Sequence, residues 1–170
     1  MFPDFPNNYQ AALYYAGLGM HVFPCYSIVD GGCRCGQSCR SPGKHPMTRD
    51  GFKSATTDPD TIKSWWERWP AANIGIRTGT VSGIWVLDLD GPAGIAALAE
   101  LEAKHGCLPK TLTALTGGGG KHLYFKTTNG LEIKNRTKVA GLSIDVRGEG
   151  GYVIAPPSNH VSGNLYKWEV

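Results

Sequence analysis

The stretch GIWVLDLDGPAG, residues 83–94, runs four apolar residues into two aspartates that are separated by one leucine. Side chains two apart on a strand share a face, so Asp88 and Asp90 point the same way, with Cα atoms roughly 7 Å apart. Two carboxylates at the end of a buried strand are costly unless a cation lies between them. Oxygen ligands suit Mg²⁺ or Mn²⁺, which predicts a metal site here. The alternative is a strand that enters an Asp-Gly turn, which explains Asp90 better than Asp88.

Length and composition favour one folded domain over residues 1–170, and the order of the expected helices and strands, given next, places it in the α/β (α+β) class. The chain is 41% hydrophobic and 10% aromatic, which is typical of a globule with a real core. Its net charge of +3 suits a polyanionic partner without identifying one. The N-terminus lacks a signal-peptide pattern, and no apolar run is long enough to span a membrane, so we expect a cytoplasmic protein without membrane contact.

Local patterns predict helices first and mostly strands later, and therefore a mixed or antiparallel sheet. A helix is expected after Asp58, which has N-cap chemistry and is followed by Pro59 at the first helical position. The other expected helices are 9–18 and 93–106, and the expected strands are 21–24, 73–77, 84–90, 111–115, 122–126, 142–147, 152–155 and 165–168.

A second chemical element is TGGGGKHLYF, residues 116–125. It is not a Walker A loop, because no Ser or Thr follows Lys121 and a strand follows in place of a helix. Glycines let phosphates approach backbone N–H groups, and His122 can donate to a phosphate oxygen. We expect Leu123 and Phe125 to face the core, with His122 and Tyr124 on the other face. The alternative is a hairpin turn with an incidental histidine.

A third element is LSIDVRGEGGYVIAPPS, residues 142–158. Alternation places Asp145 and Arg147 on one face, which adds a third carboxylate and a cation that can hold a triphosphate in a bidentate manner. The alternative for this pair is an ion pair within one strand.

Cysteines gather in CYSIVDGGCRCGQSCRSPGKHP, residues 25–46, which offers five soft ligands. A tetrahedral Zn²⁺ site needs four, and clustered cysteines in a reducing compartment favour metal over disulfides. We predict a zinc-binding loop at about 25–50 with Cys33, Cys35, Cys39 and His45 as ligands and Cys25 as a possible substitute. Arginine and lysine side chains on the loop suit DNA phosphates, although a structural role is favoured. Buried hydrophobic cysteines with free thiols are the alternative.

Together these elements resemble the archaeo-eukaryotic primase superfamily, in particular the bifunctional DNA primase/polymerase N-terminal domain of phage and plasmid replication proteins. The family's acid-x-acid motif matches Asp88 and Asp90, its small-x-His motif ends at His122, and its hydrophobic-Asp motif ends at Asp145. The sequence segments around these motifs also match the family, in the same order along the chain: GKHP (43–46), GFKSATTDP (51–59), NIGIRTG (73–79), RGEGGYVIAPPS (147–158) and HVSGNLYKW (160–168).

The resemblance implies a two-lobed fold with an RRM-like mixed sheet, and template-directed nucleotidyl transfer by a two-metal mechanism. By this likeness, two Mg²⁺ or Mn²⁺ ions are held by Asp88, Asp90 and Asp145, and His122 contacts the incoming triphosphate. The residue analysis adds Lys121, Arg147 and Arg77 as further nucleotide contacts.

The implied partners are a single-stranded DNA template and nucleoside triphosphates, with a helicase in another domain or a partner protein. Two rivals remain open: a polymerase of the same fold that extends but does not prime, and a catalytically silent nucleic-acid-binding module. A metal-dependent nuclease is less favoured, because the sequence has no His-apolar-His pair and no acid-x-Lys strand motif.

Overall fold

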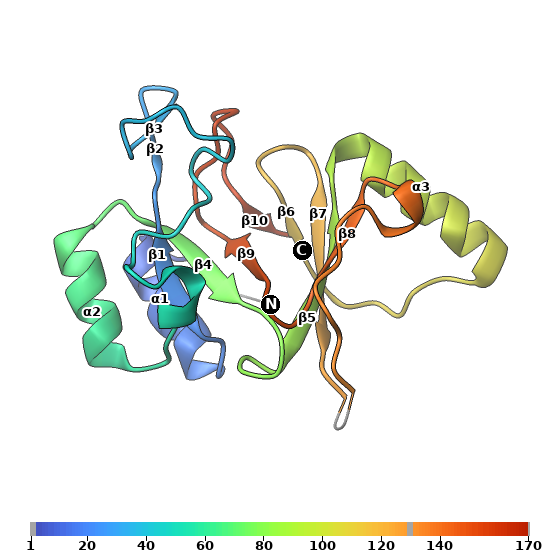
Figure 1. Ribbon diagram of the computed structural model, residues 1–170, viewed down its shortest axis with the longest axis horizontal. Coiled ribbons are helices and arrows are strands. Elements are labelled where there is room, and N and C mark those ends of the chain that lie inside the picture. Colours follow the sequence, from blue (N-terminus) through green and yellow to red (C-terminus); the bar gives the residue numbers. More distant parts are fainter. Residues whose placement is uncertain (1–2, 129–130, 170) are drawn as a thin grey trace.

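The computed structural model describes residues 3–128 and 131–169, which form two lobes, each built on its own sheet (Figure 1). The first lobe carries α1 and α2 on the sheet β1-β4-β9, and the second carries α3 on the sheet β10-β6-β7-β5-β8. The helices are α1 (Asn8–Gly17), α2 (Pro59–Arg68) and α3 (Gly91–His105), with short 3-10 turns η1 (Gly51–Ser54) and η2 (Val139–Gly141). The strands are β1 (Val22–Cys25), β2 (Ile28–Val29), β3 (Gly32–Cys33), β4 (Asn73–Arg77), β5 (Ile84–Leu89), β6 (Leu112–Leu115), β7 (Lys121–Lys126), β8 (Ile144–Arg147), β9 (Tyr152–Ala155) and β10 (Lys167–Trp168).

The two-lobed α/β architecture agrees with the prediction, and several elements fall within a residue or two of the expected bounds. Helix α2 begins as expected, because the Asp58 carboxylate accepts a hydrogen bond from the backbone N–H of Thr61 at 2.9 Å. The named strands pair only in antiparallel fashion across the described residues, so the larger sheet is the antiparallel one of the two arrangements that the local patterns predicted, and not the mixed sheet that the resemblance implied.

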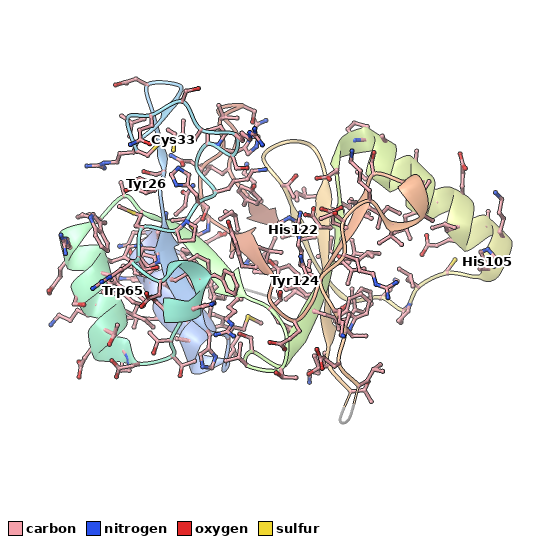
Figure 2. The ribbon with its side chains drawn as sticks, in the orientation of Figure 1. Tyr26, Cys33, Trp65, His105, His122 and Tyr124 are labelled. Carbon is pink, nitrogen blue, oxygen red and sulfur yellow. The ribbon has the colours of Figure 1, made fainter. Side chains whose placement is uncertain are left out.

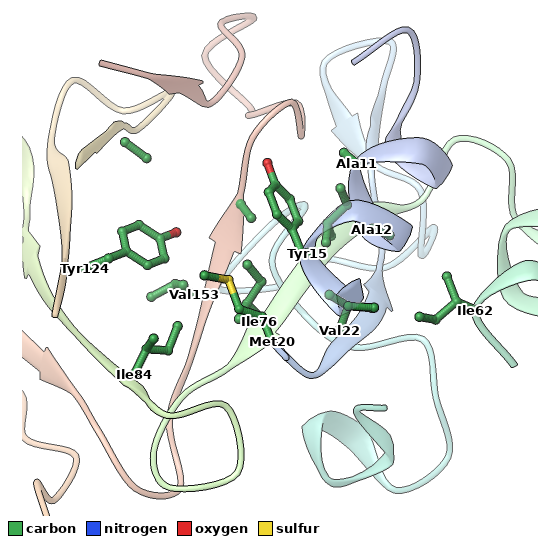
Figure 3. Close-up of a cluster of buried hydrophobic side chains, with 14 of the residues drawn as sticks. Ala11, Ala12, Tyr15, Met20, Val22, Ile62, Ile76, Ile84, Tyr124 and Val153 are labelled. Atoms are coloured by element: carbon green, nitrogen blue, oxygen red, sulfur yellow. The ribbon is translucent and has the colours of Figure 1, made fainter. Parts of the chain in front are cut away.

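One apolar core joins the two lobes. It contains Tyr15 from α1, Ile76 from β4 and Val153 from β9, together with Val86 and Tyr124 from the larger sheet. Figure 3 shows Tyr124 and Val153 on neighbouring sheets, with Met20 close to Ile76. The same face of β5 and β7 that carries Val86 and Tyr124 therefore turns toward the first lobe.

This packing reverses one expectation about β7. His122 and Tyr124 are the buried residues of the strand, whereas Leu123 and Phe125 are only partly buried. Phe125 stacks on Trp85 of β5, with ring centroids 4.6 Å apart, on the opposite face of the sheet. The alternation was predicted correctly, but the face assigned to the core was wrong, because the first lobe covers the His122 face.

Across residues 3–128 and 131–169, the helices are all too short or too polar to cross a lipid bilayer.

Candidate active site

Three adjacent strands bring three of the predicted site residues together. In the register of the larger sheet, Asp88 on β5 lies opposite His122 on β7 and opposite Asp145 on β8. All three residues are buried, with 8%, 5% and 5% of the residue surface of Asp88, His122 and Asp145 exposed, respectively. Figure 2 shows His122 beside the central strands, on the same strand as Tyr124. These three residues are 23 to 57 positions apart from one another in the sequence, yet they form one polar cluster inside the protein.

Arg147 joins the two buried carboxylates. Its Nη2 donates to Asp88 Oδ2 at 3.2 Å and to Asp145 Oδ2 at 2.6 Å, and its Nε also donates to Asp88 Oδ2 at 3.2 Å. The Nε2 atom of His122 lies 3.4 Å from the other Asp88 oxygen. The second Asp145 oxygen accepts a hydrogen bond from the backbone N–H of Lys138 at 2.7 Å. Each buried carboxylate is therefore held on both oxygens.

The third acid, Asp90, lies one residue beyond the end of β5 and is the N-cap residue of α3, without a side-chain capping bond. Burial raises the pKa of Asp90, and the nearby charges of Asp88 and Asp145 raise it further. Burial also raises the pKa of Asp88, but the hydrogen bond and charge of His122 and the charge of Arg147 outweigh it, so that pKa is lowered. The three acids thus share one electrostatic environment.

A pocket of about 300 Å³ opens at this cluster, between the two lobes. Asp88, Asp90, His122 and Arg147 belong to its lining. The other lining residues come from several parts of the chain: Ser41, Lys44, Thr116, Asn135, Gly150, Gly151, Tyr152, Val153, Ile154 and Tyr166. A concave site of this size that combines several polar groups is typical of a binding site for a small ligand.

A family model described as bifunctional DNA primase/polymerase, N-terminal (Prim-Pol), matches residues 12–170, nearly the whole chain. The chain belongs to the Prim-Pol family. A comparison with curated proteins gave no match. Prim-Pol is a family of primase-polymerases, which are nucleotidyltransferases, so the recognised resemblance and the fold agree.

The glycine loop of this Prim-Pol chain is a tight connection between β6 and β7. Its N–H groups at Gly119 and Gly120 bond back to Thr116, so they are used within the turn. A Cβ at Gly120 would overlap the Leu89 carbonyl, and one at Gly117 would overlap the side chain of His160. Close packing therefore accounts for at least two of the four glycines, and Gly120 lets the loop approach the start of α3 beside Asp90.

Two predicted nucleotide contacts lie outside the pocket lining. Lys121 alternates with His122 on β7, and its Nζ pairs with Glu169 at 2.5 Å. Arg77 ends β4 opposite Tyr152, and its guanidinium lies over the ring of Phe52, 5.6 Å from the centroid. The fold thus brings Asp88, Asp90, His122, Asp145 and Arg147 together and does not bring Lys121 or Arg77 to them.

The predicted zinc ligands form a second cluster. One ligand atom from each of Cys33, Cys35, Cys39 and His45 lies within 4.8 Å of all the others. Cys33 Sγ is 3.2 Å from His45 Nε2 and accepts a hydrogen bond from the Gly43 N–H at 3.4 Å. Three thiols and one imidazole are a donor set that Zn²⁺ prefers in tetrahedral sites.

The protonation chemistry of this cluster also fits a cation. Partial burial raises the pKa of Cys33, but hydrogen bonds from the Cys35 and Gly43 backbones and from His45 lower it to about 6. Burial and then the neighbouring Cys33 and Cys35 sulfurs raise the pKa of Cys39 to about 11. Crowded sulfurs that oppose one another's ionisation are the arrangement that a bound Zn²⁺ relieves.

Cys25 lies apart from the four. It is fully buried at the end of β1, packed with Phe23, Ile154 and Tyr166. Burial raises the pKa of its thiol well above the ordinary value. Cys25 thus has the environment of a small core residue.

Proposed function

We propose that this Prim-Pol domain catalyses template-directed nucleotidyl transfer, as a DNA primase/polymerase in phage or plasmid replication. The observation that carries the proposal is the meeting of Asp88, Asp145 and His122 as cross-strand neighbours, two of which, Asp88 and His122, line the pocket between the lobes. Family membership supplies the reaction class. The substrates are nucleoside triphosphates and a single-stranded DNA template, with a helicase domain or protein as the expected partner.

The acid cluster has the chemistry of a site for divalent cations. Asp88 and Asp145 are buried, and the Arg147 guanidinium lies between them, in contact with both. The space between the two carboxylates thus already holds one positive charge, that of Arg147. Asp90 contributes a third acid close to this space. When bound, a pair of Mg²⁺ or Mn²⁺ ions supplies activation of the attacking hydroxyl oxygen and neutralisation of charge on the leaving pyrophosphate.

Each side chain of the cluster receives a role in this proposal. Asp88, Asp90 and Asp145 hold the cations, and Asp88 is oriented by the imidazole of His122. His122 and Arg147 both line the pocket, so they are assigned to the phosphates of the incoming nucleotide. Arg147 then exchanges carboxylates for phosphate oxygens, which its planar fork binds in a bidentate manner.

The cluster of Cys33, Cys35, Cys39 and His45 is proposed to hold a structural Zn²⁺. The loop that carries it has only two short strands, β2 and β3, and little apolar surface to bury. A metal centre with four protein ligands supplies the folding free energy that such a loop lacks.

Nucleotide incorporation on a primed single-stranded template tests the proposal. Asp88→Asn and Asp145→Asn preserve side-chain size and remove the charge, so each should abolish Mn²⁺-dependent incorporation. Asp60→Asn on α2 changes an exposed carboxylate far along the chain from the cluster and should leave incorporation intact. Retention of full activity in the Asp88 variant would refute the assignment.

An unprimed template separates the two enzymatic candidates. Synthesis of a dinucleotide without a primer identifies a primase, whereas extension of primers alone identifies a polymerase that cannot initiate. If the wild-type protein binds single-stranded DNA but incorporates no nucleotide under either condition, it is a silent binding module and the proposal fails.

A further inference from the structure

We propose that Lys44, on the cysteine loop, binds phosphate groups of the incoming nucleotide and is positioned for this by the zinc cluster. The inference rests on the function proposed above and adds a pocket residue from the cysteine loop. In the sequence, Lys44 lies in the GKHP segment of the cysteine loop, 44 positions before Asp88, and the basic side chains of this loop were matched to DNA phosphates and not to the nucleotide.

Lys44 is a partly buried cation that faces an acid-lined pocket. It lines the same pocket as Asp88, Asp90 and Arg147, although it comes from the other lobe. Within residues 3–128 and 131–169, none of the ion pairs involves Lys44. A side chain that is recessed beside acids and not committed to one of them is available to an anionic ligand that bridges the pocket.

The backbone around Lys44 is held on two sides. On the side of the cysteine cluster, the Gly43 N–H donates to Cys33 Sγ, and the next residue, His45, is one of the four clustered ligands. On the side of the first sheet, Asn73 Nδ2 donates to the Gly43 carbonyl at 2.9 Å, and Tyr152 Oη donates to the Lys44 carbonyl at 3.1 Å. These hydrogen bonds therefore fix the backbone of Lys44 between the cysteine cluster and the pocket.

Gly43 makes this placement possible. Its φ is +74°, in the region that glycine adopts readily, and a Cβ there would lie 2.9 Å from Ile28 Cδ1. The chain thus turns tightly against β2 just before Lys44.

The chemistry favours a triphosphate over the DNA backbone as the ligand. A pocket of about 300 Å³ suits a small molecule, and Lys44 lines it while Arg34, Arg40 and Arg49 of the same loop are exposed. Lysine binds phosphate as a compact charge. With cations at the carboxylates and with Lys44 in the same pocket lining, a triphosphate would meet positive charge both from the acid cluster and from the cysteine loop.

The test is equilibrium binding of a nucleoside triphosphate and, separately, of inorganic triphosphate, both with Mn²⁺ present. Lys44→Met should weaken both by about 10-fold or more, as expected for loss of one charge-assisted contact. Lys44→Arg should recover part of the affinity. Arg49→Met removes an exposed cation of the same loop and should bind like the wild type.

Three outcomes would overturn the inference. Equal triphosphate affinity for Lys44→Met and wild type refutes the Lys44 contact while leaving the proposed function in place. A loss confined to single-stranded DNA binding assigns Lys44 to the template instead. Absence of any triphosphate binding by the wild-type protein overturns the inference and the proposed function together.

A double-mutant cycle tests the positioning by the zinc cluster. Cys39→Ser should release zinc and weaken triphosphate binding, and adding Lys44→Met to it should cause little further loss. Zinc chelation in the wild type and in Lys44→Met repeats the comparison without the Cys39 change. Additive losses in both comparisons would show that Lys44 acts independently of the cluster.

Discussion

Asp88 and Asp145 are direct cross-strand neighbours on β5 and β8, and one guanidinium, that of Arg147, is bonded to both. Like charges at this spacing repel each other strongly in a buried site. The arrangement is stable because Arg147 supplies the opposite charge, and this property gives the first prediction.

Arg147→Met should destabilise the metal-free protein by about 3 kcal/mol, since it leaves two buried carboxylates without their cation. Thermal unfolding measures the loss. Added Mn²⁺ should raise the melting temperature of Arg147→Met more than that of the wild type, because the ion replaces the missing charge. Lys121→Met, which breaks a more exposed pair with Glu169, is the control and should cost about 1 kcal/mol or less. Equal melting temperatures for Arg147→Met and wild type would contradict the role given to Arg147.

Gly120→Ala should destabilise the fold by about 2 kcal/mol and disturb the site, because the new methyl group meets the backbone of Leu89 and Gly91. Gly118→Ala, in the same loop, is the matched control. A Cβ at Gly118 would have His160 Cε1, 3.5 Å away, as its nearest non-adjacent atom, which is an ordinary van der Waals distance. Chemical denaturation of the two variants gives the comparison. The packing explanation of the glycine run fails if both variants lose the same stability.

Zinc content should depend on the four clustered ligands and not on Cys25. Cys33→Ser and Cys39→Ser should each purify with less zinc than the wild type, because a thiolate ligand is lost. Cys25→Ala should retain zinc, although it should lose some stability by leaving a small core cavity. Elemental analysis of the purified proteins measures the zinc content of each variant. If Cys39→Ser holds as much zinc as the wild type, Cys39 is not a zinc ligand.

Glu149 should make stability depend on pH. Hydrogen bonds from the N–H and hydroxyl of Thr80 lower the pKa of Glu149 below its ordinary value of 4.5. The charged form is thus favoured by folding, so its stabilisation is present above pH 4.5 and is lost as the pH falls through the lowered pKa. Melting temperatures of wild type and Glu149→Gln should therefore differ most near neutrality and converge in acid. A gap that widens on acidification would contradict this assignment.

Local sequence patterns were sufficient for much of this fold. The Asp58-Pro59 signal placed the start of α2, and short apolar stretches placed β4 and β9 at their observed bounds. The cysteine spacing also identified the four residues that lie within 4.8 Å of one another. These features depend on short-range chemistry: capping, periodicity and ligand density within a loop.

The remainder depends on contacts between distant segments. Alternation along β7 showed that His122 and Lys121 point to opposite faces, but not which face the first lobe covers. Lys121 therefore looked available to a nucleotide, whereas it pairs with Glu169 near the end of the described chain. Lys44 and Tyr152 reach the pocket only because the lobes meet, and the local signals considered in the sequence do not encode that meeting.

The central claim is that the carboxylates of Asp88, Asp90 and Asp145 bind shared divalent cations together with a nucleotide. Anomalous diffraction from crystals soaked with Mn²⁺ and a nucleoside triphosphate tests it most directly. We predict Mn²⁺ peaks within bonding distance of all three carboxylates, with Arg147 moved onto the phosphates. Crystals with bound nucleotide but no Mn²⁺ at these acids, and with Arg147 still bridging Asp88 and Asp145, would contradict the account.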